Sequence, residues 1–103
     1  MNEISCLELK QLLKNKSISL IDVREKEEVD ICSINGAIHI PMNSLPLELP
    51  KLKINTKYAI ICHSGVRSYH ACNYLLKLGF SVVNVIGGID KWALTCDLKM
   101  KRY

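Results

Sequence analysis

Short apolar runs rich in β-branched residues recur along the chain, and each is followed by a turn or by a segment with a helix-like pattern. Runs of this length, bounded by turn residues, predict buried β-strands. The second run is stopped by Pro41, and the third ends directly before a cysteine. The predicted strands lie within residues 17–23, 35–41, 57–61 and 81–86.

Helix signals occupy the segments before, between and after these strands. Ser5 and Glu8 form the pattern of a capping box in residues 4–15, and the leucines that follow recur on one helical face. Residues 68–78 predict a second helix, which ends at Gly79. Two shorter helices and a helical turn region broken by prolines are expected in residues 24–31, 87–94 and 43–52, respectively.

The alternation of strands and helices predicts an α/β fold, with a central parallel sheet and helices on both of its faces. No repeat, linker or low-complexity segment interrupts the 103 residues, so residues 1–103 are predicted to form a single domain. Open parallel sheets bind ligands beyond the carboxyl ends of their strands. Residues 62–68, "CHSGVRS", occupy such a position, between a predicted strand and a predicted helix.

Composition narrows the classes of protein to which the chain can belong. No run approaches the roughly 18 apolar residues of a membrane span, and the first residues lack the basic and then apolar pattern of a signal peptide. The five cysteines are an odd number without CxxC spacing, which argues against a disulfide framework and against a zinc site. We therefore expect a cytoplasmic protein with reduced thiols, no bound metal and no membrane partner.

The charge is distributed unevenly along the chain. Residues 1–50 carry a net charge of −3, whereas residues 51–103, which include the loop at 62–68, carry +7. A positive region suits an anionic ligand. Its cations are scattered and accompanied by only one aromatic cluster, so we expect no nucleic-acid partner.

Three residues of the loop together favour an active site. A cysteine is nucleophilic as its thiolate, which is stabilised by a helix N-terminus, a nearby arginine or converging backbone amides. Cys62 precedes a predicted helix that starts near Arg67, and Gly65 allows the backbone a positive φ between them. Singly, such residues are typical of a buried thiol, a solvated helix end and a turn. Their combination after a central strand favours a site for an anion or a charged sulfur.

At this point the sequence resembles the rhodanese-like domains. The loop "CHSGVRS" is similar to the family's Cys-x-x-Gly-x-Arg-Ser active-site loop. Residues 20–41 resemble the family's first signature, and residues 79–92 resemble its closing signature, with Gly-Gly followed by a Trp. The chain departs from the family where Cys32 and Ser33 replace a common Gly-His.

The resemblance implies a sulfurtransferase that carries sulfur as a persulfide on Cys62, its catalytic nucleophile. The Cys62 thiolate would attack the outer sulfur of a small anionic donor such as thiosulfate, and cyanide or a thiol would then accept the sulfur. No cofactor and no metal are implied. The substrate-binding residues carried over from the family are His63, Ser64, Gly65, Val66, Arg67 and Ser68.

Two other functions stay open at the level of sequence. Cysteine phosphatases resemble this loop but have five residues between Cys and Arg, whereas four separate Cys62 from Arg67. The shorter loop predicts a tighter ring of amides, which suits sulfur better than phosphate. The alternative is a sulfur carrier or docking module that passes sulfur from Cys62 to a protein acceptor and turns over small donors poorly, as the small size of a lone domain suggests.

Several other residues are expected to have structural rather than catalytic roles. Asp22 and Arg24 are predicted to form an ion pair or cap that supports the loop, because the expected mechanism needs no carboxylate. His63 is expected to face solvent and to add positive potential when protonated. Cys32 is interpreted as an ordinary thiol, with a second sulfur acceptor as the alternative. The basic residues 98–103 are expected to be solvated.

Overall fold

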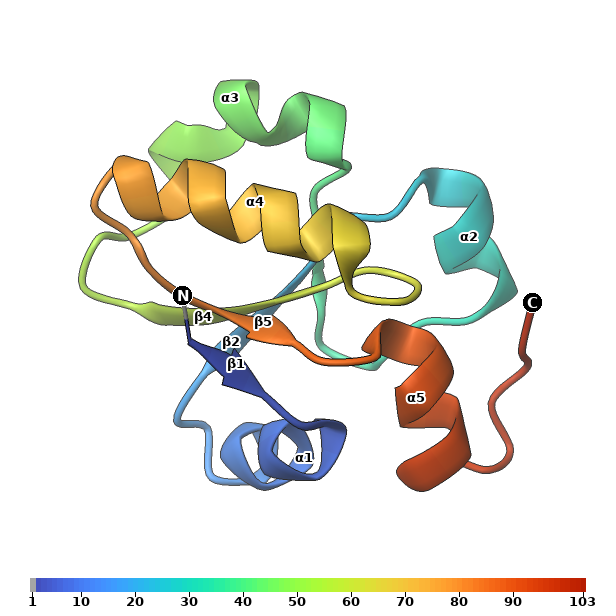
Figure 1. Cartoon of the computed structure of the whole chain (residues 1–103). Helices are drawn as coiled ribbons and strands as arrows, with labels where there is room; N and C mark the ends of the chain where they lie inside the picture. Colours follow the sequence, from blue (N-terminus) through green and yellow to red (C-terminus); the bar gives the residue numbers. More distant parts are fainter. Residues whose placement is uncertain (1) are drawn as a thin grey trace.

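Five parallel strands form the central sheet of the protein (Figure 1). The computed structural model describes residues 2–103. The strands are β1 (Glu3–Ile4), β2 (Ser19–Asp22), β3 (Ile38–His39), β4 (Lys57–Ile61) and β5 (Ser81–Val85). Their order across the sheet is β1-β5-β4-β2-β3, and every neighbouring pair is parallel. The predicted α/β fold with a parallel sheet is confirmed, and β4 is its central strand.

Helices cover both faces of the sheet, as predicted. Figure 1 shows α3 and α4 on one face, α1 and α5 on the other, and α2 beyond the end of β2. The helices are α1 (Cys6–Lys14), α2 (Lys26–Ile31), α3 (Leu45–Glu48), α4 (Val66–Lys77) and α5 (Gly88–Thr95), with short 3₁₀ turns at Met42–Ser44 and Leu49–Lys51. Within residues 2–103, none of these helices has the length and apolar content to cross a membrane.

Alternation along β4 builds one apolar cluster on each face of the sheet. Successive side chains of a strand point to opposite faces. Tyr58 and Ile60 therefore belong to the cluster beneath α4, and Ala59 and Ile61 belong to the cluster that packs against α1 and α5. Because β4 is buried on both faces, a continuous apolar run was the correct signal for it.

The helix boundaries follow local capping chemistry. The predicted capping box is confirmed, because the Ser5 hydroxyl accepts from the Glu8 amide and the Glu8 carboxylate accepts from the Ser5 amide. The helix predicted at 68–78 begins two residues earlier, at Val66. Gly65 is its N-cap in a left-handed conformation, which turns the chain into the helix at once. The region 43–52 is broken into short helical turns, as its prolines predicted.

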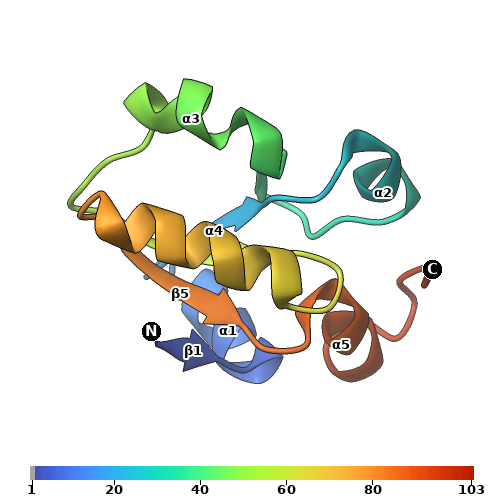
Figure 2. The ribbon, with the colours of Figure 1, turned by 45° about the horizontal axis from the view of Figure 1, so that its top comes forward.

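One short segment differs from the sequence-based expectations. Glu3 and Ile4 form β1, which pairs with Asn84 and Val85 of β5, although no strand was predicted there. Two residues are too few for a period-2 pattern to be recognised. The basic segment 98–103 runs from the end of α5 toward α2 (Figure 2), and Lys99, Lys101 and Arg102 are exposed, as expected.

Candidate active site

Strand alternation buries Cys62 beneath the first turn of α4. Cys62 directly follows β4, and its side chain joins the same apolar cluster as Tyr58 and Ile60. Only 1% of the residue is exposed. The thiol therefore lies at the carboxyl end of the central strand, the edge at which parallel sheets bind ligands.

The loop between β4 and α4 surrounds the Cys62 sulfur with backbone polarity. Gly65 has a φ of +109°, and its amide donates a hydrogen bond to Cys62 Sγ at 3.1 Å. The Tyr69 amide donates to the Gly65 carbonyl, so the amides before it in the first turn have no acceptor one turn earlier in the helix. The N-terminus of α4 thus adds positive potential beside the sulfur.

A buried polar network continues from the sulfur into β5. Ser68 Oγ lies 3.3 Å from Cys62 Sγ and donates to Asn84 Oδ1 at 2.5 Å. The Asn84 amide nitrogen in turn donates to the Gly65 carbonyl and to the Glu3 carboxylate, each at 3.2 Å. The side chain of Asn84 therefore ties the start of α4 to the sheet and fixes the direction of the Ser68 hydroxyl.

The N-terminus of α5 holds the first residues of the loop. The Ile89 amide donates to the Cys62 carbonyl at 2.9 Å, and the Asp90 amide donates to the His63 carbonyl at 3.1 Å. Gly88 makes this approach possible, because a Cβ at its position would lie 2.5 Å from the Cys62 carbonyl oxygen. Two helix N-termini, those of α4 and α5, therefore meet at this loop.

The loop arginine is engaged in a bidentate ion pair. The Arg67 Nη1 and Nη2 atoms donate to the two carboxylate oxygens of Glu28 on α2, at 2.6 and 2.8 Å. This hydrogen bonding lowers the pKa of Glu28 to about 2. The pair persists at neutral pH, so the positive charge of Arg67 is offset by a neighbouring negative charge.

The predicted Asp22–Arg24 ion pair is confirmed and is buried. Arg24 Nη2 lies 2.8 Å from Asp22 Oδ2, and neither side chain is appreciably exposed. Arg24 also donates to the Cys32 carbonyl at 2.7 Å and to the Tyr103 hydroxyl at 2.9 Å. The burial of Arg24 opposes its charge, but the hydrogen bonds with Asp22 and Tyr103 outweigh burial and raise its pKa.

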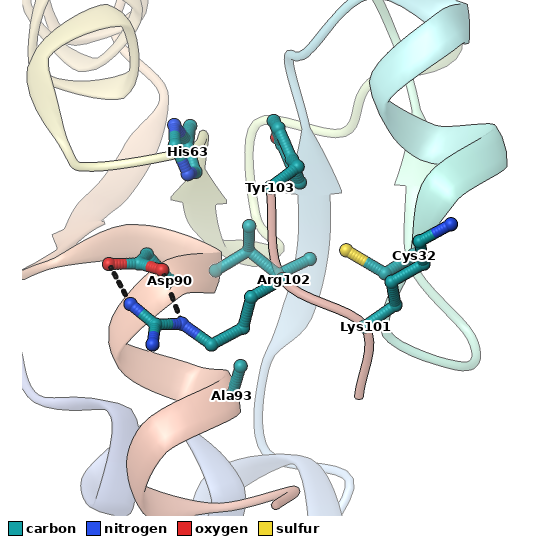
Figure 3. Close-up of a pocket in the computed structure, with 8 residues that line it drawn as sticks. Cys32, His63, Asp90, Ala93, Lys101, Arg102 and Tyr103 are labelled. Carbon is teal, nitrogen blue, oxygen red and sulfur yellow. Dashed lines mark hydrogen bonds and ion pairs between the residues drawn. The ribbon is translucent and has the colours of Figure 1, made fainter. Parts of the chain in front are cut away.

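Tyr103 covers one side of the loop, contrary to the expectation for His63. Its ring stacks on His63, with ring centroids 4.3 Å apart and an interplanar angle of 16°. His63 is therefore half-buried rather than solvent-facing, and its Nε2 has no hydrogen-bond partner within residues 2–103. Arg102 of the same segment pairs with Asp90 of α5 at 3.0 Å, and its side chain stays about half exposed (Figure 3).

Comparison with known proteins shows the family to which the sequence motifs and this geometry point. Residues 5–95 match the family of rhodanese-like domains. The chain belongs to the rhodanese-like family. A rhodanese-like domain protein from Staphylococcus aureus superposes with a TM-score of 0.87 at 36% sequence identity, over 100% of this chain and 99% of that structure.

Relatives of known name agree with this rhodanese-like assignment. The chain is 36% identical over 94 residues to a sulfurtransferase of Allochromatium vinosum, covering 89% of this chain and 88% of that protein. It is 28% identical over 90 residues to the thiosulfate sulfurtransferase GlpE of Tolumonas auensis, covering 86% of this chain and 85% of that protein. The chain is a sulfurtransferase of the rhodanese family.

The loop contains the residues that the sequence predicted for the site, and it is contacted by residues that the sequence did not assign to the site. Residues 62–68 form one continuous loop and first helical turn, as expected. Glu28, Tyr103 and Gly88 were not associated with the loop, because each reaches it from a distant part of the chain. Asn84 carried a local signal, since it interrupts the apolar run of residues 82–86.

A hollow of about 300 Å³ lies beside the loop, between the start of α4 and the end of β5. Its rim includes the exposed apolar side chains of Val66, Tyr69 and Ile86. The remaining lining residues are Glu3, Ser64, Gly65, Asn84 and Gly87.

Proposed function

We propose that this sulfurtransferase moves a sulfane sulfur from a small anionic donor to cyanide or a thiol through a persulfide on Cys62. The supporting observation is the hydrogen bond from the Gly65 amide to Cys62 Sγ at the N-terminus of α4. A backbone amide and a helix N-terminus stabilise negative charge on sulfur, both in the thiolate and in the terminal sulfur of a persulfide. The donor would bind along residues 63–68, mainly through their backbone.

The first half-reaction is a displacement at sulfur. The Cys62 thiolate attacks the outer sulfur of thiosulfate, a bond forms between Sγ and that sulfur, and the sulfur–sulfur bond of the donor breaks. The electron pair of the broken bond leaves with sulfite, and the protein retains a persulfide anion. Total charge is conserved without a proton transfer, so no catalytic carboxylate or histidine is needed.

The second half-reaction returns Cys62 to its starting state. Cyanide attacks the terminal sulfur of the persulfide, the electron pair of the Sγ–sulfur bond returns to Cys62, and thiocyanate leaves. A thiolate acceptor reacts in the same way and leaves as its own persulfide. Ping-pong kinetics are expected, because the donor product departs before the acceptor binds.

Mass spectrometry of the intact protein tests this proposal. Incubation with thiosulfate and removal of the excess should leave an adduct of about 32 Da, one sulfur atom, that peptide mapping assigns to Cys62. Cyanide should remove the adduct with formation of thiocyanate. Cys62→Ser is the matched control and should take up no sulfur. An unmodified wild-type Cys62, or an equal adduct in the control, contradicts the proposal.

A protein acceptor is a second candidate, favoured by the hollow beside the loop. Val66 is 64% and Ile86 is 52% exposed, and together with Tyr69 they line one hollow, as apolar side chains of a contact surface do. Val66→Ser with Ile86→Ser should leave transfer to cyanide unchanged and slow transfer to a protein thiol. Equal effects on both acceptors would remove the support for this candidate.

A further inference from the structure

The arginines around the active site are all neutralised by carboxylates. The chain has three arginines, Arg24, Arg67 and Arg102. Each lies in an ion pair, with Asp22, Glu28 and Asp90 as the respective partners. The positive potential that the loop offers a donor therefore comes mainly from backbone amides and from the N-termini of α4 and α5, rather than from uncompensated side chains.

Glu28 is held in place by contacts from three other parts of the chain. Both of its oxygens accept from Arg67. Oε2 also accepts from the Glu25 amide at 2.9 Å, as part of the capping box of α2, and Oε1 accepts from the Tyr103 hydroxyl at 3.0 Å. Tyr103 is fixed in turn by Arg24 and by its stacking on His63. This carboxylate cannot turn away from Arg67 without breaking several contacts.

We propose that Glu28 is a specificity-determining residue that lowers the preference of the enzyme for dianionic sulfur donors over monoanionic ones. It acts through Arg67, the charged side chain of the loop, and Tyr103 is the positioning residue that keeps Glu28 on Arg67. The proposal rests on the proposed function, because it concerns the donor of the same reaction.

The effect on donor selectivity follows from the net charge of Arg67 and Glu28. A free arginine beside Cys62 would attract a dianion more strongly than a monoanion. With Glu28 bound to it, the pair has no net charge and discriminates weakly between the two. Because both charges of the pair lie partly in solvent, removing the carboxylate should change the selectivity by about fivefold rather than by orders of magnitude.

Two donors that differ by one charge provide the test. Thiosulfate is a dianion that releases sulfite, and methanethiosulfonate is a monoanion that releases methanesulfinate by the same displacement. For Glu28→Gln, we expect the ratio of kcat/KM for thiosulfate to that for methanethiosulfonate to rise about fivefold, through a lower KM for thiosulfate. The rise should shrink at high ionic strength.

Glu27→Gln is the matched control, because it removes the same charge from the neighbouring exposed position of α2. Its ratio should stay within about twofold of wild type. Tyr103→Phe keeps the ring and removes the hydroxyl, and its ratio should fall between those of wild type and Glu28→Gln. In an Arg67→Gln background, Glu28→Gln should no longer raise the ratio. An unchanged ratio in Glu28→Gln, or the same rise in both backgrounds, overturns the inference.

A measurement without turnover separates this inference from the proposed function. Sulfate, an unreactive dianion, should protect Cys62 from alkylation by neutral iodoacetamide, and about fivefold less sulfate should give half-protection in Glu28→Gln. If wild-type Cys62 takes up no sulfur but this shift is found, the proposed function fails and the role of Glu28 stands. If the persulfide forms and the shift is absent, the role of Glu28 fails alone.

Discussion

Cys62 and Cys72 are equally buried thiols ten residues apart, but the polar groups next to their sulfur atoms differ. They are 1% and 0% exposed, and they belong to the same apolar cluster between the sheet and α4. Cys72 lies within α4, where the backbone amides are used by the helix itself. Cys62 lies before α4, where the amide of Gly65 points at its sulfur.

Cys72 illustrates how burial acts on a thiol that has no hydrogen bond from a backbone amide of residues 2–103. Burial disfavours the thiolate and, with the negative charges of Glu3 and Cys62 nearby, raises the pKa of Cys72 to about 12. Cys6, which is also buried in an apolar cluster, has its pKa raised to about 11, mainly by burial. Exposure therefore does not distinguish Cys62 from Cys72 or Cys6. The polar contact of the sulfur does, because Cys62 Sγ accepts from the Gly65 amide, whereas Cys6 Sγ lies against the carbonyls of Ile86 and Gly88.

Substituting Cys62 and Cys72 singly should give the largest difference in the rate of sulfur transfer. Cys62→Ser should lower sulfur transfer from thiosulfate to cyanide by at least about 10³-fold, because the persulfide cannot form. Cys72→Ala should keep the rate within about threefold and cost about 1–2 kcal/mol of stability, since it removes a buried sulfur. Steady-state thiocyanate formation and urea unfolding measure the two effects. A comparable loss of rate in both variants would contradict the contrast.

A substitution in α5 should disturb the backbone of Cys62, because Gly88 lies against its carbonyl. Gly88→Ala forces a methyl group onto the carbonyl of Cys62 and adds left-handed strain, for a total of about 3 kcal/mol in unfolding free energy. Gly36→Ala is the matched control, because Gly36 has a similar positive φ but no atom within 4 Å of the added Cβ. It should cost about 1 kcal/mol and leave transfer unaffected. Equal costs in the two variants would mean that the contact with Cys62 does not matter.

The buried thiol should make the protein sensitive to alkaline pH. Above pH 9 the Cys72 thiol ionises in the unfolded chain but keeps its proton in the folded protein up to about pH 12. The unfolded state then binds fewer protons, so stability falls as pH rises through this range, by up to about 2 kcal/mol between pH 9 and 11. Urea unfolding of wild type and Cys72→Ala at several pH values isolates this contribution. Identical slopes in the two proteins would contradict it.

The contrast between the two cysteines was largely readable from local sequence. The continuous apolar run within residues 57–61 and the glycine at position 65 indicate where the strand ends and how the chain turns into α4. These signals depend on neighbouring residues, so they predicted the parallel sheet and the loop. The start of α4 was misplaced by two residues because the left-handed Gly65 shortens the turn.

Contacts between distant segments could not be read in the same way. Arg67 pairs with a glutamate 39 positions away, and Tyr103 reaches Arg24 across 79 positions. Glu28 resembles its neighbours Glu25 and Glu27 in sequence, and only the folded chain places it against Arg67. The charge of the loop was therefore overestimated, because a pattern records that a cation is present but not that a distant carboxylate neutralises it.

The smallest effect is expected from the hydroxyl beside Cys62. Ser68 gives its one hydrogen to Asn84, so it can only accept from the Cys62 thiol. When Cys62 is ionised, that hydrogen can turn to Sγ at the cost of the bond to Asn84. Ser68→Ala removes this donor and should slow persulfide formation about tenfold. Ser64→Ala, an exposed change in the same loop, should leave the rate unchanged, and stopped-flow reaction with thiosulfate measures both. Equal rates in the two variants would mean that Ser68 does not stabilise the thiolate. The stabilisation would then come from the Gly65 amide and the N-terminus of α4, and Cys72 has neither beside its sulfur.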